Sequence, residues 1–133
     1  MSNEAVIINV AGVTAVRRTC AAGTSISKGT LLALSDANLV YASSGVGEAF
    51  GGIAAHDKDG ADGSTSIGTY MEGVFDLTNS SVVIAAAGAM VIMSGANIIA
   101  AARASDLLSG GVIGKIEEQA SANEVVRVRL LGY

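Results

Sequence analysis

The residues best suited to chemistry lie in one short glycine-rich stretch of the chain, residues 56–63. Its carboxylates alternate with other residues at Asp57, Asp59 and Asp62. This pattern suits a hard cation such as Ca²⁺, because several oxygens must converge around the ion while the backbone turns tightly. However, Ala61 and Gly68 stand where a helix–loop–helix calcium site needs oxygen ligands. We therefore expect a solvated acidic loop, with a weak calcium site at these three carboxylates as the alternative.

Nucleophilic catalysis is the other chemistry to consider. The only histidine, His56, precedes Asp57, and the chain has many serines. Adjacent His and Asp residues rarely orient each other, and no Gly-x-Ser-x-Gly segment is present. Cys20 is the only cysteine, so no disulfide forms within the chain, and we expect it to be a small buried hydrophobe. The sequence thus predicts a protein that is not an enzyme and needs no cofactor; a small hydrolase is the disfavoured alternative.

Composition indicates that the chain packs against other chains. Half of the residues are hydrophobic, only 15% are charged, and the net charge is −4. A small domain with so little charge is expected to expose apolar surface unless a partner covers it. The scattered basic residues argue against a nucleic-acid partner, which requires clustered Lys and Arg. The first four residues lack the basic start of a signal peptide, so we expect synthesis in a cytoplasm.

One uncharged stretch, Val82 to Ala102, is long enough to span a bilayer. Gly88, Gly95 and Asn97 interrupt it, and the segment 94–97 has the composition of a turn. We therefore expect no membrane partner.

The last 110 or so residues contain one unit written twice, at an offset of 59 positions. Residues 28–40 align with 87–99, and without a gap the same offset places Gly51–Ala54 over Gly110–Ile113 and Gly73 over Gly132. Glycines and apolar positions coincide, whereas charged positions mostly do not. The copies therefore share backbone shape and core positions and no reactive centre, which indicates a structural module.

Short β-branched and apolar segments between turn residues predict strands. These segments are 14–22, 26–34, 39–42, 50–55, 65–71, 74–78, 89–93, 98–102, 112–117 and 124–131. One helical turn at 102–108, capped by Ser105-Asp106, and a longer helix across 82–87 are rival interpretations. The prediction is an all-β fold, a small β-barrel or β-sandwich with internal duplication and an extended N-terminal arm. The arm covers residues 1–12, and residues 13–133 form a single β domain of two repeats, about 14–73 and 74–133.

The arm has two interpretations. It is either the first strand of its own sheet, or a strand added to a neighbouring subunit, with Val6, Ile7, Ile8 and Val10 as partner-binding residues. The chain has no proline, so its edge strands must be protected by charge, by bulges or by a partner chain.

Several segments resemble the small decoration (cement) proteins of tailed-phage capsids, a family also labelled head-fibre-like. The similarity covers most of the chain from about Ile26 onward. It lies in Ile26–Leu32, Phe50–Ala54, Gly73–Leu77, Gly88 with Val91, Gly114 with Glu117, and Val126–Leu130. Where the family usually has a Gly-Asp turn, this chain has Gly29-Thr30 and Gly88-Ala89.

The resemblance implies a β-rich bacteriophage structural protein without a cofactor, forming homotrimers or other symmetric clusters on the outer capsid surface of the virion. Its partner would be the major capsid protein, and its function would be capsid stabilisation by binding between capsid subunits after assembly in the host cytoplasm. A receptor- or carbohydrate-binding fibre module of a virion is the alternative function.

Overall fold

The computed structural model is all-β, as the sequence predicts. It describes residues 5–9, 15–35, 38–84, 86–103, 105–106 and 110–131. The strands are β1 Val6–Asn9, β2 Val16–Cys20, β3 Leu31–Leu34, β4 Leu39–Ala42, β5 Ala49–Ala54, β6 Ser66–Tyr70, β7 Glu72–Asn79, β8 Met90–Met93, β9 Ile98–Ala101, β10 Val112–Ile116 and β11 Val125–Leu131. Each expected strand is present, although most are shorter than the sequence pattern suggested.

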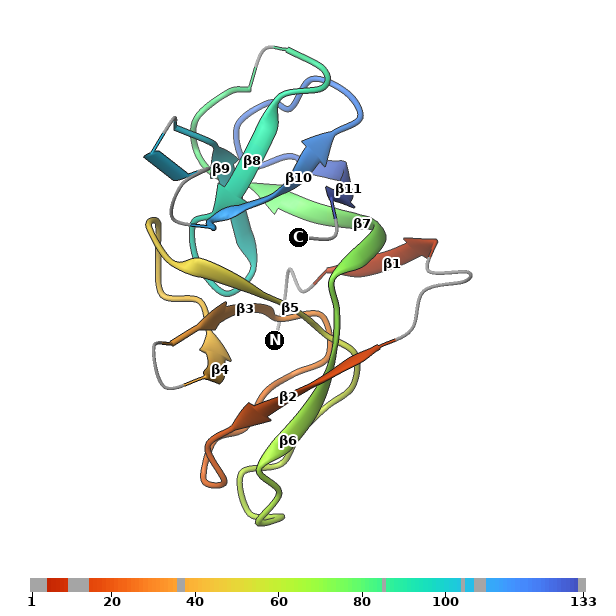
Figure 1. Cartoon of the computed structure of the whole chain (residues 1–133). Helices are drawn as coiled ribbons and strands as arrows, with labels where there is room; N and C mark the ends of the chain where they lie inside the picture. Colours follow the sequence, from red (N-terminus) through yellow and green to blue (C-terminus); the bar gives the residue numbers. More distant parts are fainter. Residues whose placement is uncertain are drawn as a thin grey trace.

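The strands form two rings (Figure 1). The first is a closed barrel in the order β2-β4-β3-β5-β6. In the second sheet, the order β7-β11-β10-β8-β9 is closed by an additional pairing of β7 with β9. Closure removes most sheet edges, which leaves few edge strands for charge, bulges or a partner chain to protect. The exception is β1, which pairs antiparallel with β7 at the second ring.

The pairing registers show that the two rings are copies. In the first ring Leu32 pairs with Ala42, and in the second Val91 pairs with Ala101, 59 positions later in both strands. The parallel pairing of β2 with β4 recurs in the same way between β7 and β9. The duplication read from the sequence is therefore a duplication of strand topology.

One part of the gap-free alignment is wrong. In the first ring Leu32 pairs with Gly52, whereas its counterpart Val91 pairs with Gly114. The counterpart of Gly52 is thus Gly114 and not Gly111, a shift of three positions confined to β5 and β10. The loop before β10 is longer than its counterpart and the loop after it is shorter, which restores the offset in β6 and β11.

Both of these equivalent glycines sit where a neighbouring strand comes very close. A Cβ at Gly52, whose φ is +115°, would lie 2.7 Å from the Cβ of Thr69. A Cβ at Gly114 would overlap the carbonyl group of Arg129. The absence of a side chain therefore allows the last two strands of each ring to meet.

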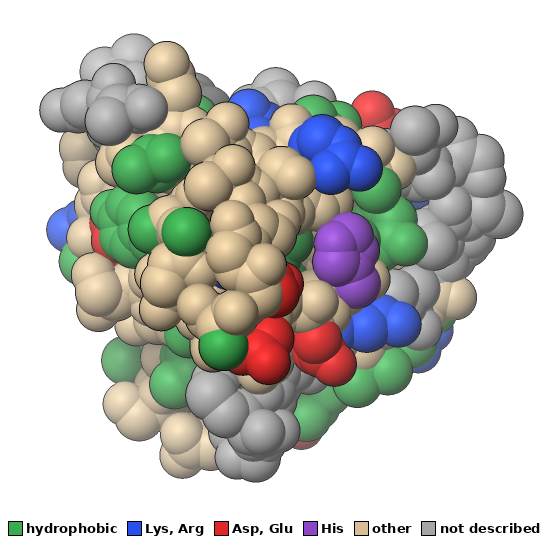
Figure 2. Space-filling model, turned by 90° about the horizontal axis from the view of Figure 1, so that it is seen from below, with side chains coloured by type: hydrophobic (Ala, Val, Ile, Leu, Met, Phe, Trp, Pro, Cys, Tyr) green, Lys and Arg blue, Asp and Glu red, His purple; other side chains and the backbone are tan. Residues whose placement is uncertain are grey.

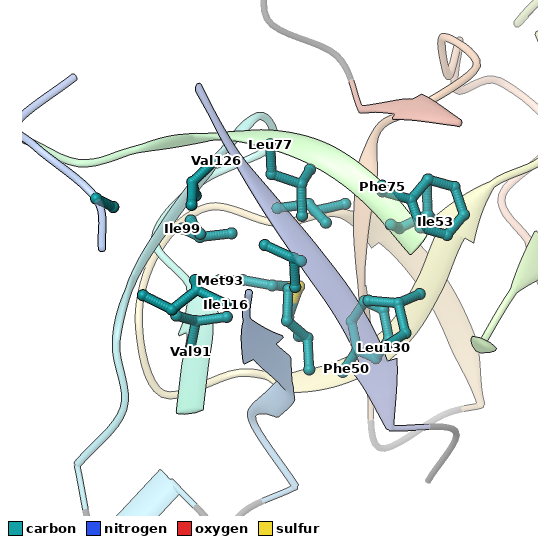
Figure 3. Packing of buried hydrophobic residues seen from close by; sticks show 14 of the residues in the cluster. Phe50, Ile53, Phe75, Leu77, Val91, Met93, Ile99, Ile116, Val126 and Leu130 are labelled. Carbon is teal, nitrogen blue, oxygen red and sulfur yellow. The ribbon is translucent and has the colours of Figure 1, made fainter. Parts of the chain in front are cut away.

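A single core connects the rings. The larger buried cluster combines Leu31, Phe50 and Ile53 from the outer face of the first barrel with Phe75 and Leu130 from the second ring (Figure 3). A smaller cluster, which includes Leu32, Val40 and Ile67, fills the first barrel. Since neither ring buries its apolar surface alone, the two form one packed body.

The structure also decides between the rival local predictions. Ile84 forms an antiparallel bridge with Ala120, so the predicted helix across 82–87 is wrong. Ser105 and Asp106 are helical, while the rest of the predicted turn lies partly outside the described residues. Among the described residues, no helix is long and apolar enough to cross a membrane.

Candidate functional site

The acidic loop of the first barrel does not gather its carboxylates around a common point. Asp57 accepts a hydrogen bond from the backbone N–H of Lys28 at 2.7 Å, across the loop. Asp59 and Asp62 accept from backbone N–H groups two residues ahead of each, as in Asx turns. Within the described residues, no three acidic, His or Cys side chains are placed to hold a metal ion. In the structure Asp59 and Asp62 each stabilise a turn of their own and Asp57 bonds across the loop, and the weak calcium site at these carboxylates stays a prediction.

A buried lysine holds this loop to the rest of the barrel. The Nζ of Lys58 donates to the carbonyls of Ala22 and Thr24 at 3.0 Å each, and lies 3.5 Å from a carboxylate oxygen of Asp62. Its side chain is only 2% exposed, whereas that of Asp62 is 41% exposed. A hydrogen bond from the backbone of Ser64 and the nearby ammonium lower the pKa of Asp62 below its usual value.

Beside this lysine, the surface is hollowed into a shallow depression of about 610 Å³. It is lined by Ser25, Ile26, Ser27, Lys28, Asp57, Lys58 and Asp59. The depression is mostly polar, and hydroxyl, ammonium and carboxylate groups all surround it. Figure 2 looks onto this end of the molecule, where acidic side chains and the histidine lie at the surface.

The histidine is not arranged for catalysis. His56 is exposed, and its Nε2 accepts a long hydrogen bond of 3.5 Å from the backbone N–H of Gly68. Asp57 bonds elsewhere, so it does not orient the imidazole. Cys20 is buried in the core of the first barrel, as expected for a small hydrophobe. These groups form neither a triad nor a Cys–His pair.

The loop between β4 and β5 is organised around one carboxylate. Glu48 accepts hydrogen bonds from the hydroxyls of Tyr41, Ser43 and Ser44 and from the backbone N–H groups of Ser44 and Gly45. Partial burial opposes ionisation, but these hydrogen bonds prevail and lower the pKa of Glu48 below its usual value. The loop is thus a folded structure with its glutamate at the centre.

The corresponding connection in the second ring contains an ion pair between an exposed arginine and a buried aspartate. Asp106, whose side chain is 2% exposed, accepts from the backbone N–H of Arg103 at 2.7 Å and from its guanidinium at 3.0 and 3.1 Å. Hydrogen bonding to Arg103 lowers the pKa of Asp106 below its usual value, although burial opposes this. Among the described contacts, Asp106 reaches back to the backbone N–H and the guanidinium of Arg103.

Exposed apolar side chains gather around the end of β7 in the second ring. Val125 on β11 and Ile98 on β9 both pair with Thr78, so they flank it on the outer face and are 58% and 37% exposed. Val82 and Val83 follow β7 after two intervening residues, where the side-chain amide of Asn79 donates a hydrogen bond to the carbonyl of Val82, and they are 66% and 59% exposed. We call these four residues the apolar end. Their exposure marks a surface suited to contact with another macromolecule.

The N-terminal arm lies on its own chain in the structure. Ile7 pairs with Phe75 of β7, and Val6 and Ile8 are 58% and 40% exposed. Val10 lies outside the described residues. Docking of the arm on a neighbouring subunit stays a prediction, and the exposed Val6 and Ile8 are the residues available for it.

Comparison with known proteins identifies no relative. No family model matches the chain, and no curated protein matches it at a significant level. The function must therefore be argued from the surfaces themselves.

Sequence reasoning did not identify the apolar end. Val82, Val83 and Ile98 belong to the uncharged stretch that was weighed as a membrane segment, and Val125 to a strand that was expected to be half buried. The signal was present as the adjacent Val82 and Val83. The pairings of Thr78 place Val125 and Ile98 on either side of the end of β7, which no local pattern indicates.

Proposed function

We propose that this protein is a non-enzymatic decoration protein of a tailed-virus capsid, which binds between major capsid protein subunits and stabilises the shell. The observation that carries the proposal is the apolar end, a cluster of exposed Val and Ile side chains on an otherwise closed β structure. The low charge of the chain and the duplicated fold agree with a binding role. The resemblance of its glycine and apolar patterns to capsid decoration proteins supplies the kind of partner.

The proposed mechanism is clamping. The apolar end would bury its valines in the junction between capsid subunits, each Å² of apolar surface contributing about 25 cal/mol before association costs. A single interface of this size is weak, but equivalent sites repeated over a shell add up when the copies also bind one another in a symmetric cluster. A homotrimer is the arrangement that the resemblance implies, and the mass of the particles in light scattering tests it.

The experiment adds purified protein to expanded shells that lack decoration and measures the temperature at which they rupture. We expect that temperature to rise, and we expect the double variant V82D/V83D to bind at least about tenfold more weakly. Both valines are exposed, so the charges do not disturb the fold. The matched control is V46D, since Val46 is similarly exposed at 51% but lies on the β4–β5 loop of the first barrel.

Shells that neither bind the protein nor rupture at a higher temperature would refute the proposal. Equal binding by V82D/V83D and by the unchanged protein would show that the contact with the shell lies outside the apolar end.

A specific observation also favours a second function, a carbohydrate-binding fibre module. The depression of about 610 Å³ at the first barrel is lined with Ser, Lys and Asp side chains, which are suited to hydrogen bonding with sugar hydroxyls. Lys28 is exposed at its rim, so K28A should abolish glycan binding without loss of stability. Screening of the protein against immobilised glycans distinguishes the two functions, because a decoration protein gives no signal.

A further inference from the structure

The duplication gives the molecule two equivalent strand edges, and within the described residues only one of them is paired with an added strand. In the second ring, β7 pairs with β11 on one side; on its other side, β9 pairs with Thr78 and Asn79, and β1 pairs with Val74, Phe75 and Asp76. In the first ring, the counterpart β2 pairs with β6 on one side, and β4 pairs with Thr19 and Cys20 on the other. The counterpart of the β1 position is therefore the edge of β2 at Ala15, Val16 and Arg17.

No described residue pairs with that edge. Ala15 and Arg17 are exposed and Val16 is 42% exposed, whereas the equivalent Val74 and Phe75 are buried. The remaining partners of β2 have the same registers as those of β7, with Arg17 opposite Gly68 where Asp76 is opposite Arg127. The edge thus has the backbone conformation that accepts an antiparallel strand in the other ring. We call it the open seat.

We propose that the open seat binds an extended segment of the shell subunit by antiparallel strand addition, in the register that β1 adopts on β7. This inference rests on the proposed function, which supplies the partner. Each chain has two seats and one arm, and its own β7 holds that arm. Since no other segment within the described residues pairs with the second seat, we expect its strand to come from a different polypeptide.

The pairing of β1 with β7 indicates what chemistry the segment has. A residue in the place of Val6 would lie opposite Arg17 instead of Asp76, and the next residue opposite Val16. Main-chain hydrogen bonds would supply affinity, and β-branched side chains would cover the exposed Val16. Because Arg17 lies exposed on this edge, the segment is neutral or acidic, as the arm itself is.

The test uses a synthetic peptide of residues 4–10, Glu-Ala-Val-Ile-Ile-Asn-Val, as the probe strand on the intact chain. We expect saturable binding of one peptide per chain, because the cis arm already fills the seat on β7. A peptide with Val6→Cys should form a disulfide with R17C, since directly opposed residues of an antiparallel pair lie within bonding reach. Buried Cys20 is not accessible to compete.

The matched control is T19C. Thr19 is exposed on the same strand, but its edge is already paired with Leu39 of β4, so we expect at least about tenfold less cross-link there than at R17C. A further variant, D76C, detects peptide that has displaced the chain's own arm from β7, because Asp76 lies opposite Val6 in that pairing.

Failure of the peptide to bind at millimolar concentration, equal cross-linking at T19C, or cross-linking at D76C alone would each overturn the open seat. The peptide experiments do not depend on the capsid, because they contain no shells. If the chain binds the peptide but does not bind shells, the open seat is supported and the proposed function is refuted. If the chain binds shells but does not bind the peptide, only the open seat is refuted.

Discussion

The two rings share strand order and registers, yet they place different chemistry at equivalent positions. Leu77 points into the second ring and is fully buried, whereas its counterpart Arg18 is partly buried and donates a 3.6 Å hydrogen bond to the sulfur of Met71. Ala120 bridges Ile84 where Lys58 bridges Ile26. The first barrel thus uses polar groups for tasks that apolar packing performs in the second.

The same contrast applies to the two outer ends. The end of the second ring carries the apolar cluster with Val125, and Ser66 is the first-barrel counterpart of that valine. The acidic loop reaches Ser66 through Ser64, which donates from its backbone N–H to Asp62 and from its hydroxyl to the carbonyl of Ser66; the polar depression lies at the same loop. The two repeats therefore share a scaffold, whereas their exposed ends differ: the end of the second ring is apolar and the end of the first is polar. The predictions below test whether burial, rather than strand position, determines the role of each residue.

The largest effect is expected at a position that is buried in one ring and exposed in the other. Phe75 is 0% exposed and lies in the core shared by the rings, so F75A should lower the free energy of unfolding by about 4 kcal/mol. Its counterpart Val16 is 42% exposed, and V16A should cost about 0.5 kcal/mol. Urea unfolding measures both. Similar losses at the two positions would mean that the rings are stabilised equally by this strand.

A somewhat smaller loss, about 3 kcal/mol, is expected for G114A, because the added Cβ overlaps backbone atoms of Arg129 that cannot move aside. Gly95 is the control, since a Cβ there meets no atom within 4 Å and its φ is not left-handed. G95A should be as stable as the unchanged protein or slightly more stable in the same urea titration. A tolerated G114A would contradict the close approach of β10 and β11.

Removal of the buried ammonium should cost about 2 kcal/mol. K58M keeps the apolar stem but leaves the carbonyls of Ala22 and Thr24 without their donor. K115M removes an exposed lysine from β10 and should change stability by less than about 0.5 kcal/mol. Thermal unfolding of the two variants compares them directly. An unchanged melting temperature for K58M would show that the lysine only fills space.

The smallest effect depends on pH. The folded state lowers the pKa of Asp106, so its ionised form stabilises the fold at pH values above its unfolded pKa, and this contribution is lost as pH falls through the folded pKa. D106N should therefore cost about 1.5 kcal/mol at pH 7 and progressively less below about pH 4. Melting curves from pH 7 to pH 2.5 test this, with exposed Glu118 as the site of the control E118Q. A difference that is constant with pH would contradict the ion pair with Arg103.

The sequence predicted the strands well, because glycine and Asn turns separate the β-branched segments. Leu39–Ala42 was located to the residue. Ring closure could not be predicted, since it depends on pairings such as β7 with β9 that no local pattern encodes. The position of β10 was misaligned because compensating loop changes on either side preserved the overall offset. The roles of Asp57 and Lys58 were also hidden, because their partners are backbone groups some 30 residues away.

Only Met71 separates β6 from β7, and Figure 1 shows the two strands running on as one continuous ribbon. A joint of one residue, packed against the common core, leaves no hinge. The two ends of the molecule therefore keep a fixed mutual orientation. If the apolar end is anchored, the polar end of the first barrel projects at a set angle. A population of copies anchored in this way would present a uniform outer coat, with the same polar loops turned toward the surrounding water.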